Sequence, residues 1–147
     1  MKVFISHAYK DEPLVKKLAT KLENAGFEVW DATRDVRADG KWSEQVDHAL
    51  EDSDAMVAIL SADALLSSWV RHEIEYALCE PGYRRRLVPV LAGDSQGLSK
   101  EDVPWILRHL NMIDMDEHDE ESGISKIVQV LSDNAVTDSH PASPPTS

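Results

Sequence analysis

The chain has little of the chemistry that marks disulfide-rich, membrane-spanning or nucleic-acid-binding proteins. Its one cysteine, Cys79, excludes an internal disulfide and a cysteine metal cluster, and it fits a reducing compartment. No apolar run reaches the ~18 residues that span a bilayer, and the run at residues 2–5 is too short for a secretory signal. A formal net charge of −12 argues against nucleic acid or an anionic membrane as the main partner. We therefore expect a cytoplasmic protein.

Short apolar segments alternate with amphipathic ones along most of the 147 residues, which suffice for one domain with a sizeable core. Strands are expected near residues 2–6, 27–30, 55–60, 87–91 and 112–115. Helices are expected near 12–25, 42–50, 67–80 and 103–109, and around 124–131. This alternation predicts an α/β fold, a parallel sheet with helices on both faces.

Proline and glycine mark several boundaries of these elements. Pro13 falls in the first turn of the first helix, where proline is tolerated, and Gly26 is a suitable left-handed stop after it. The run Ala55–Leu60 is the most apolar and is expected to be the central strand. Pro89 lacks a backbone donor, which predicts a strand without hydrogen bonds on both sides at that point. The domain is expected over 1–132, and the Pro/Ser-rich segment 133–147 as a disordered tail or linker.

The expected helix at 67–80, entered through a serine cap at Ser67 or Ser68, carries the most informative acid of the chain. At 100° per residue its apolar stripe consists of Val70, Ile74, Ala77 and Leu78. Glu73 lies at the border of that stripe, between Trp69 and Tyr76 one turn away on either side. A carboxylate in that position can be half-desolvated and reactive. The alternative is a solvated helix glutamate.

The segment 31–40 is charged and shows no period, so we expect a long loop, and long loops in compact domains are often functional. Trp42 follows it in the first turn of the next helix, where its ring either reaches over the loop or packs in the core. In parallel α/β folds ligands bind beyond the carboxyl ends of the strands. Four segments are expected to converge there: 6–10, 31–40, 61–63 with the turn holding Trp69 and Glu73, and 92–93.

An ordered set of short motifs resembles the TIR (Toll/interleukin-1 receptor) domain family, and its bacterial NAD-cleaving branch in particular. The motifs are Phe4-Ile5-Ser6-His7, Gly26-Phe27-Glu28-Val29-Trp30-Asp31, Gly40-Lys41-Trp42, Ile59-Leu60-Ser61 and Ser68-Trp69-Val70-Arg71-His72-Glu73-Ile74. The resemblance covers roughly residues 1–132. It implies a flavodoxin-like five-stranded parallel sheet.

The resemblance also implies roles for individual residues. Glu73 matches the family's catalytic glutamate, and Trp69 the aromatic residue that stacks on a substrate ring. Ser6 and His7 lie in the loop that receives the nucleotide, and Trp42 matches the bulky residue after the mobile loop 31–40. The implied activity is NAD+ glycohydrolase or cyclase chemistry that releases nicotinamide and yields ADP-ribose or a cyclic isomer, in signalling or antiviral defence. The implied partners are NAD+, as substrate rather than cofactor, and further copies of the chain.

A lone carboxylate suits this chemistry. Ordinary glycoside hydrolysis needs a second carboxyl group to protonate the leaving oxygen. The nicotinamide of NAD+ is positively charged and leaves neutral, so Glu73 alone can stabilise the ribosyl cation that forms. Candidate donors to the pyrophosphate are the backbone amides near residues 6–8 and the side chains of Arg34, Arg37 and Lys41.

The sequence also bears on two other functions and on a metal site. A non-catalytic TIR module would assemble through the loop 31–40 and its helix faces. A phospho-receiver needs acidic residues where Ser61 and Ser6-His7 stand, so we set it aside. The histidines show no paired ligand spacing, which favours surface positions and no metal; they are His7, His48, His72, His109, His118 and His140.

Overall fold

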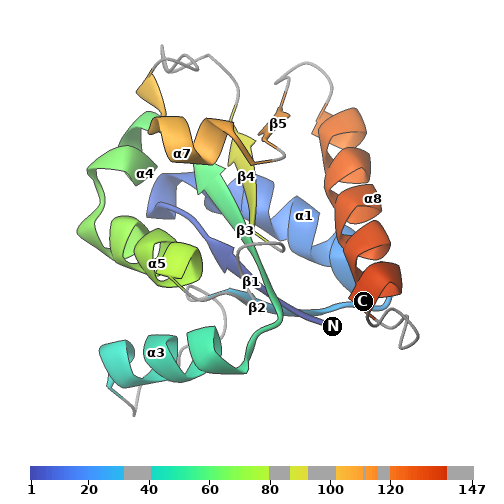
Figure 1. Cartoon of the computed structure of the whole chain (residues 1–147), viewed down its shortest axis with the longest axis horizontal. Coiled ribbons are helices and arrows are strands. Elements are labelled where there is room, and N and C mark those ends of the chain that lie inside the picture. The colour runs from blue at the N-terminus through green and yellow to red at the C-terminus, as the bar shows by residue number, and fades with distance from the viewer. Residues whose placement is uncertain (32–40, 80–86, 93–101, 111, 116–119, 139–147) are drawn as a thin grey trace, which may run out of the picture.

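The computed structural model describes residues 1–31, 41–79, 87–92, 102–110, 112–115 and 120–138. Its centre is a parallel sheet of five strands in the order β2-β1-β3-β4-β5 (Figure 1). The strands are β1 (Lys2–Ser6), β2 (Glu28–Asp31), β3 (Ala55–Leu60), β4 (Leu87–Leu91) and β5 (Ile113–Asp114). The predicted fold class and the central position of Ala55–Leu60 are confirmed. Every residue of β3 is buried, as expected for a strand covered on both faces.

The order in which successive strands are added to the sheet reverses between β1 and β3. From β1 it moves outward to β2, and then it crosses back to β3 on the other side of β1. The register pairs Ile5 with Asp31 on one side of β1, and Ser6 with Ala58 on the other. In such sheets the ligand crevice lies at this reversal, beyond the carboxyl ends of the strands. Ser6 and the residues that follow it therefore stand at the expected edge.

Helices cover both faces of the sheet and divide the core in two (Figure 1). Helices α1 (Glu12–Asn24) and α8 (Glu120–Asp138) pack on one face. Helices α3 (Trp42–Asp52), α4 (Ala62–Leu66), α5 (Ser68–Cys79) and α7 (Trp105–Arg108) pack on the other. Side chains of β1 alternate between the two layers: Val3 and Ile5 face α1, whereas Phe4 faces α3 and α5.

The predicted boundaries around the first helix are confirmed. A short 3-10 turn, η1 (Tyr9–Asp11), leads into α1, and Pro13 lies in the first turn of that helix. Gly26 follows the helix with φ of 98°, a conformation that glycine adopts without the steric cost of a side chain. Pro89 also behaves as predicted, because the ladder between β4 and β5 begins only at Val90.

Two features differ from the sequence-based expectations. Helix α4 was not expected, because its five residues are too few to show a period. It begins after Ser61, whose hydroxyl accepts a hydrogen bond from the Ala64 backbone N–H at 3.1 Å. Helix α8 continues to Asp138, six residues beyond the expected domain end at 132. Residues 139–147 lie outside the described part of the chain, so the predicted tail stays a prediction there.

No helix among the described residues is long and apolar enough to span a membrane.

Candidate active site

Glu73 projects from the buried side of α5 and not toward solvent. Val70, Ile74 and Ala77 anchor this face of the helix in the core, while Arg71 and Glu75 are exposed. Glu73 itself is only 5% exposed, so the alternative of a solvated helix glutamate is wrong. Burial raises the pKa of Glu73 from the usual 4.5 to about 7, although a hydrogen bond from Ser6 lowers it in part. A pKa in this range is typical of carboxyl groups that take part in chemistry.

The hydroxyl of Ser6 is the hydrogen-bond donor to Glu73. Ser6 Oγ lies 2.7 Å from Glu73 Oε1, in a contact between side chains that are 67 positions apart in the chain. Ser6 is 1% exposed, and it points to the same face of the sheet as Phe4 because side chains along a strand alternate. The resemblance implied that Ser6 lies in the loop that receives the nucleotide. The structure places it in hydrogen-bond contact with Glu73, and it is not among the residues that line the neighbouring pocket.

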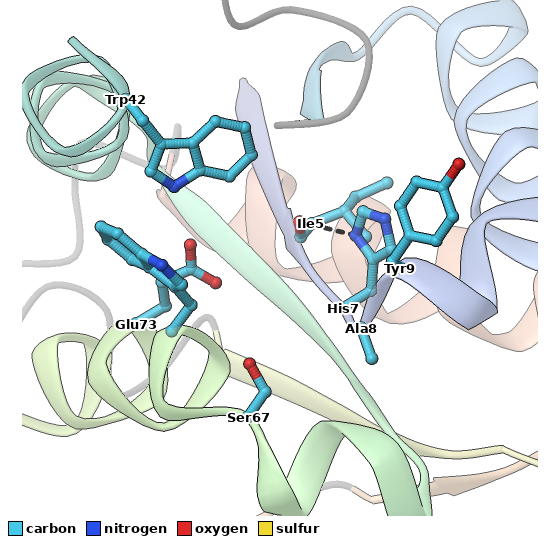
Figure 2. Close-up of a pocket in the computed structure, with 8 residues that line it drawn as sticks. Ile5, His7, Ala8, Tyr9, Trp42, Ser67 and Glu73 are labelled. Carbon is cyan, nitrogen blue, oxygen red and sulfur yellow. Dashed lines mark hydrogen bonds between the residues drawn. The ribbon is translucent and has the colours of Figure 1, made fainter.

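A pocket of about 290 Å³ opens in front of Glu73, close to the lower size limit of small-molecule sites. Figure 2 shows the Glu73 carboxyl reaching from α5 into the space below Trp42, with His7 and Tyr9 across from it. The lining residues come from the end of β1, from η1, and from the starts of α3 and α5: Ile5, His7, Ala8, Tyr9, Trp42, Ser67, Trp69 and Glu73. The pocket thus lies at the predicted edge of the sheet.

Two tryptophans form one wall of this pocket. Trp42 and Trp69 are 42% and 41% exposed, and their ring centroids lie 6.1 Å apart at an interplanar angle of 69°. Trp42 therefore does not belong to the core, which was the alternative considered from the sequence. Partly exposed indole rings can stack on a flat heterocycle and attract a cationic one. Trp69 also contacts His72, and on that side it lines a second, shallow hollow with Ser43 and Asp47.

His7 lines the opposite side of the pocket and is held by acidic neighbours. Its Nε2 lies 2.8 Å from Glu12 Oε1 and 3.5 Å from Asp31 Oδ1, while Nδ1 lies 3.5 Å from the Ile5 carbonyl oxygen. The His7 side chain is only 4% exposed, so the expectation of a surface histidine is wrong here. The tight packing of strand, turn and helix at this edge buries it.

The same three side chains could hold a metal ion. His7, Glu12 and Asp31 each offer one ligand atom, and these atoms lie within 4.8 Å of one another. The separation of 2.8 Å between His7 and Glu12 is also that of an ordinary charge-assisted hydrogen bond. The hydrogen bond accounts for the geometry without an ion.

A second buried acid lies close to the pocket without lining it. Asp11 accepts a hydrogen bond from the Ser61 hydroxyl at 2.6 Å. Burial raises the pKa of Asp11, and the bond from Ser61 and the nearby His7 oppose that rise. Ser61 was expected at the ligand crevice, but its hydroxyl joins η1 to the first turn of α4.

A model of the TIR domain matches residues 3–128, which is most of the chain. The chain belongs to the TIR domain family.

Curated relatives of this TIR domain include two bacterial enzymes. A 2′ cyclic ADP-D-ribose synthase from Bacteroides thetaiotaomicron is 31% identical over 72 residues, which are 48% of this chain and 25% of the relative. A 2′ cyclic ADP-D-ribose synthase from Acinetobacter baumannii is 30% identical over 74 residues, which are 50% and 28% of the two chains. The matched segment thus spans about a quarter of each relative.

Solved structures of TIR-containing proteins have the same fold. A metazoan TIR-STING receptor from C. gigas, described in complex with 2′,3′-cGAMP, superposes with a TM-score of 0.73 at 27% identity. The match covers 88% of this chain and 39% of the receptor. The predicted membership of the family and its flavodoxin-like sheet are therefore confirmed.

The structure of this TIR domain brings together four of the five residues singled out from its sequence. His7, Trp42, Trp69 and Glu73 line one pocket, and Ser6 supports it from below. The loop 32–40, with Arg34 and Arg37, and Gly93 lie outside the described residues. Sequence reasoning named Tyr9 only as part of the segment 6–10 and Ser67 only as a possible helix cap, and it gave neither residue a role of its own in the pocket.

Proposed function

We propose that this TIR domain cleaves the bond between nicotinamide and ribose in NAD+. The observation that carries the proposal is Glu73, a buried carboxyl group that faces a tryptophan-walled pocket. The names of the two bacterial relatives, both cyclic ADP-ribose synthases at about 30% identity, support the same substrate.

The chemistry needs one anionic group and an aromatic wall. As the bond from C1′ to the nicotinamide nitrogen breaks, its electrons remain on the nitrogen, so nicotinamide leaves neutral and positive charge develops on the ribose. The ionised Glu73 carboxylate, itself only 5% exposed, stabilises that charge with less screening than it would have in open solvent. Trp42 and Trp69 hold the flat base and favour it while it is cationic.

The ADP-ribosyl unit then has two fates. Water that adds to C1′ and loses a proton gives ADP-ribose, and a hydroxyl of the same molecule gives a cyclic isomer. The names of both relatives, as cyclic ADP-ribose synthases, favour the cyclic product for this chain. Release of a signalling nucleotide would fit a role in antiviral defence, which we keep as part of the proposal together with a cytoplasmic location.

The test is incubation of the protein at high concentration with NAD+, followed by chromatography and mass spectrometry of the products. We expect nicotinamide and a cyclic ADP-ribose, with ADP-ribose as the minor product. The variant Glu73→Gln should release nicotinamide at least about a hundredfold more slowly, whereas Glu75→Gln, which changes an exposed glutamate of the same helix, should behave as wild type. Undiminished turnover in a folded Glu73→Gln protein would end the proposal.

The second candidate is a TIR scaffold that acts by binding other copies of itself. Two large apolar side chains favour such contacts, since Leu66 is 82% and Trp105 is 63% exposed. Sedimentation at increasing protein concentration should show association, which Leu66→Ser should weaken. Association without any cleavage of NAD+ would favour this scaffold over the enzyme.

A further inference from the structure

The hydroxyl of Ser6 occupies a buried position at the end of β1. The register between β1 and β3 fixes its backbone opposite Ala58, at the carboxyl end of the strand. The side chain is 1% exposed and does not line the pocket. A serine hydroxyl carries one hydrogen, and here that hydrogen is donated to Glu73 Oε1 at 2.7 Å.

We propose that Ser6 is a positioning residue for Glu73: it holds one carboxyl oxygen, leaves the other for the pocket and stabilises the ionised form. The proposal rests on the proposed function, because it concerns the group that would stabilise the ribosyl cation. It assigns Ser6 no contact with NAD+, in contrast to the binding role that the family resemblance implied.

The physical basis is the difference in hydrogen-bond strength between the two states of the acid. A hydroxyl donates a stronger bond to a carboxylate than to a neutral carboxyl group. Burial works in the opposite direction and favours the neutral form of Glu73. Ser6 therefore favours the ionised, reactive form of Glu73, whereas burial alone would favour the neutral form.

The ionisation of Glu73 also depends on the other titratable groups around the pocket. Among the described residues, His7 and Tyr9 are the titratable side chains that line the pocket with Glu73. His7 directs its Nε2 at Glu12 and Asp31. Three further lining residues carry no charge: Trp42 of α3, Ser67 just before α5, and Trp69 in the first turn of α5. The Ser6 hydroxyl is therefore the group whose removal we expect to change the ionisation of Glu73.

The first measurement is a carboxyl titration by carbon NMR, with glutamate labelled at the carboxyl carbon and Glu73→Gln used to assign the signal. The wild-type midpoint is expected near 7. Ser6→Ala should raise the midpoint by about one pH unit, the size expected for the loss of one charge-assisted hydrogen bond. This readout needs no turnover, so it gives an answer even if NAD+ is not the substrate.

A matched control is available at the other end of the sheet. Ser53 is also a buried serine, 8% exposed, and its hydroxyl donates to the Ala49 carbonyl oxygen at 2.7 Å. Ser53→Ala removes the same group from a similar environment and should leave the Glu73 midpoint unchanged. If Ser6→Ala does not fold, Ser6→Cys is measured in its place, because a thiol is close in size to a hydroxyl but is a weak hydrogen-bond donor.

The second measurement is the pH profile of NAD+ cleavage. Ser6→Ala should retain about a tenth of the wild-type kcat at pH 6 and approach it near pH 9, with KM changed by less than about twofold. A substrate contact would give the opposite pattern, a higher KM at an unchanged midpoint, and would overturn the proposal.

The two proposals fail in distinguishable ways. An NMR midpoint that stays the same in both Ser6 variants overturns the role of Ser6, whatever the activity. If that midpoint rises while the wild-type protein leaves NAD+ intact, the action of Ser6 on Glu73 stands and the proposed reaction falls.

Discussion

Two buried acids, each bonded to a serine, lie near the same edge of the sheet and have different consequences. Glu73 accepts from Ser6 at 2.7 Å and Asp11 accepts from Ser61 at 2.6 Å, and burial raises the pKa of both. Glu73 lines the pocket, whereas Asp11 does not. Ser61 also accepts from the backbone of α4, so the Asp11 pair joins two elements of the fold. A raised pKa therefore does not identify a reactive group unless the group also faces a cavity.

The largest effect on activity is expected when the charge of Glu73 is removed. The matched change at Asp11 should have little effect. Glu73→Gln should lower kcat for NAD+ cleavage by at least about a hundredfold, the usual cost of losing one group that stabilises transition-state charge. Asp11→Asn should stay within about fivefold of wild type, because its amide oxygen still accepts from Ser61. Both are measured as initial rates of nicotinamide release, with circular dichroism as the check on folding. Equal losses in the two variants would remove the distinction between the acids.

The tryptophan wall is the second feature that sets the Glu73 region apart. Trp69→Ala should lower kcat/KM by about tenfold to a hundredfold, because base stacking on an aromatic ring contributes about 1–3 kcal/mol. Trp105→Ala removes an exposed tryptophan, 63% accessible, that does not line the pocket, and it should leave kcat/KM unchanged. Steady-state kinetics on both proteins measure the difference. Similar losses would indicate a general effect of removing surface indoles.

Stability should respond to pH through Glu73 with the opposite sign from activity. Its folded pKa of about 7 lies above the ordinary 4.5, so the folded state keeps a proton that the unfolded chain has lost. The free energy of unfolding should therefore fall as pH rises from 4.5 to 7 and level off above that. Glu73→Gln should avoid this loss and exceed wild type by about 1–3 kcal/mol at pH 8, and by little at pH 4.5. Urea denaturation at the two pH values measures it, and an equal difference at both would contradict the assignment to Glu73.

The smallest effect on activity is expected at the hydrogen-bonded pair of Asp11 and Ser61. Ser61→Ala removes the cap of α4 and the donor to Asp11, and should cost about 1–2 kcal/mol of stability. The midpoint of the activity profile should not move, because Glu73 keeps its bond from Ser6. Thermal melting and the pH profile of NAD+ cleavage together measure this. A displaced midpoint would mean that the two acids are coupled.

Periodicity in the sequence was sufficient to predict the layers of the fold and the helix face that bears the acid. It placed Trp42 at the start of α3, as the structure has it, and Glu73 at the border of the apolar stripe of α5, whereas the structure puts Glu73 within the buried face of that helix. It did not predict α4, which depends on a single capping serine. Nor did it predict the bond between Ser6 and Glu73, because contacts between distant segments depend on how a helix settles on the sheet.

Local sequence patterns also did not predict how deeply the side chains of the site are buried. The spacing of the aromatic residues indicated a half-desolvated carboxyl group, whereas Glu73 is 5% exposed. His7 was expected at the surface, but it is enclosed by Glu12 and Asp31, which belong to two other elements. Both differences arise from packing at the edge where β1, β2, α1 and α5 meet.

The half-exposed indoles of Trp42 and Trp69 give the protein a built-in optical reporter. Of its four tryptophans, Trp30 is stacked on Phe4 with centroids 5.1 Å apart, and Trp105 does not line the pocket. A dinucleotide that stacks on the other two would quench their ultraviolet emission while leaving a constant background from Trp30 and Trp105. Occupancy of the pocket can thus be followed by intrinsic fluorescence in Glu73→Gln, without a dye and without consumption of the ligand.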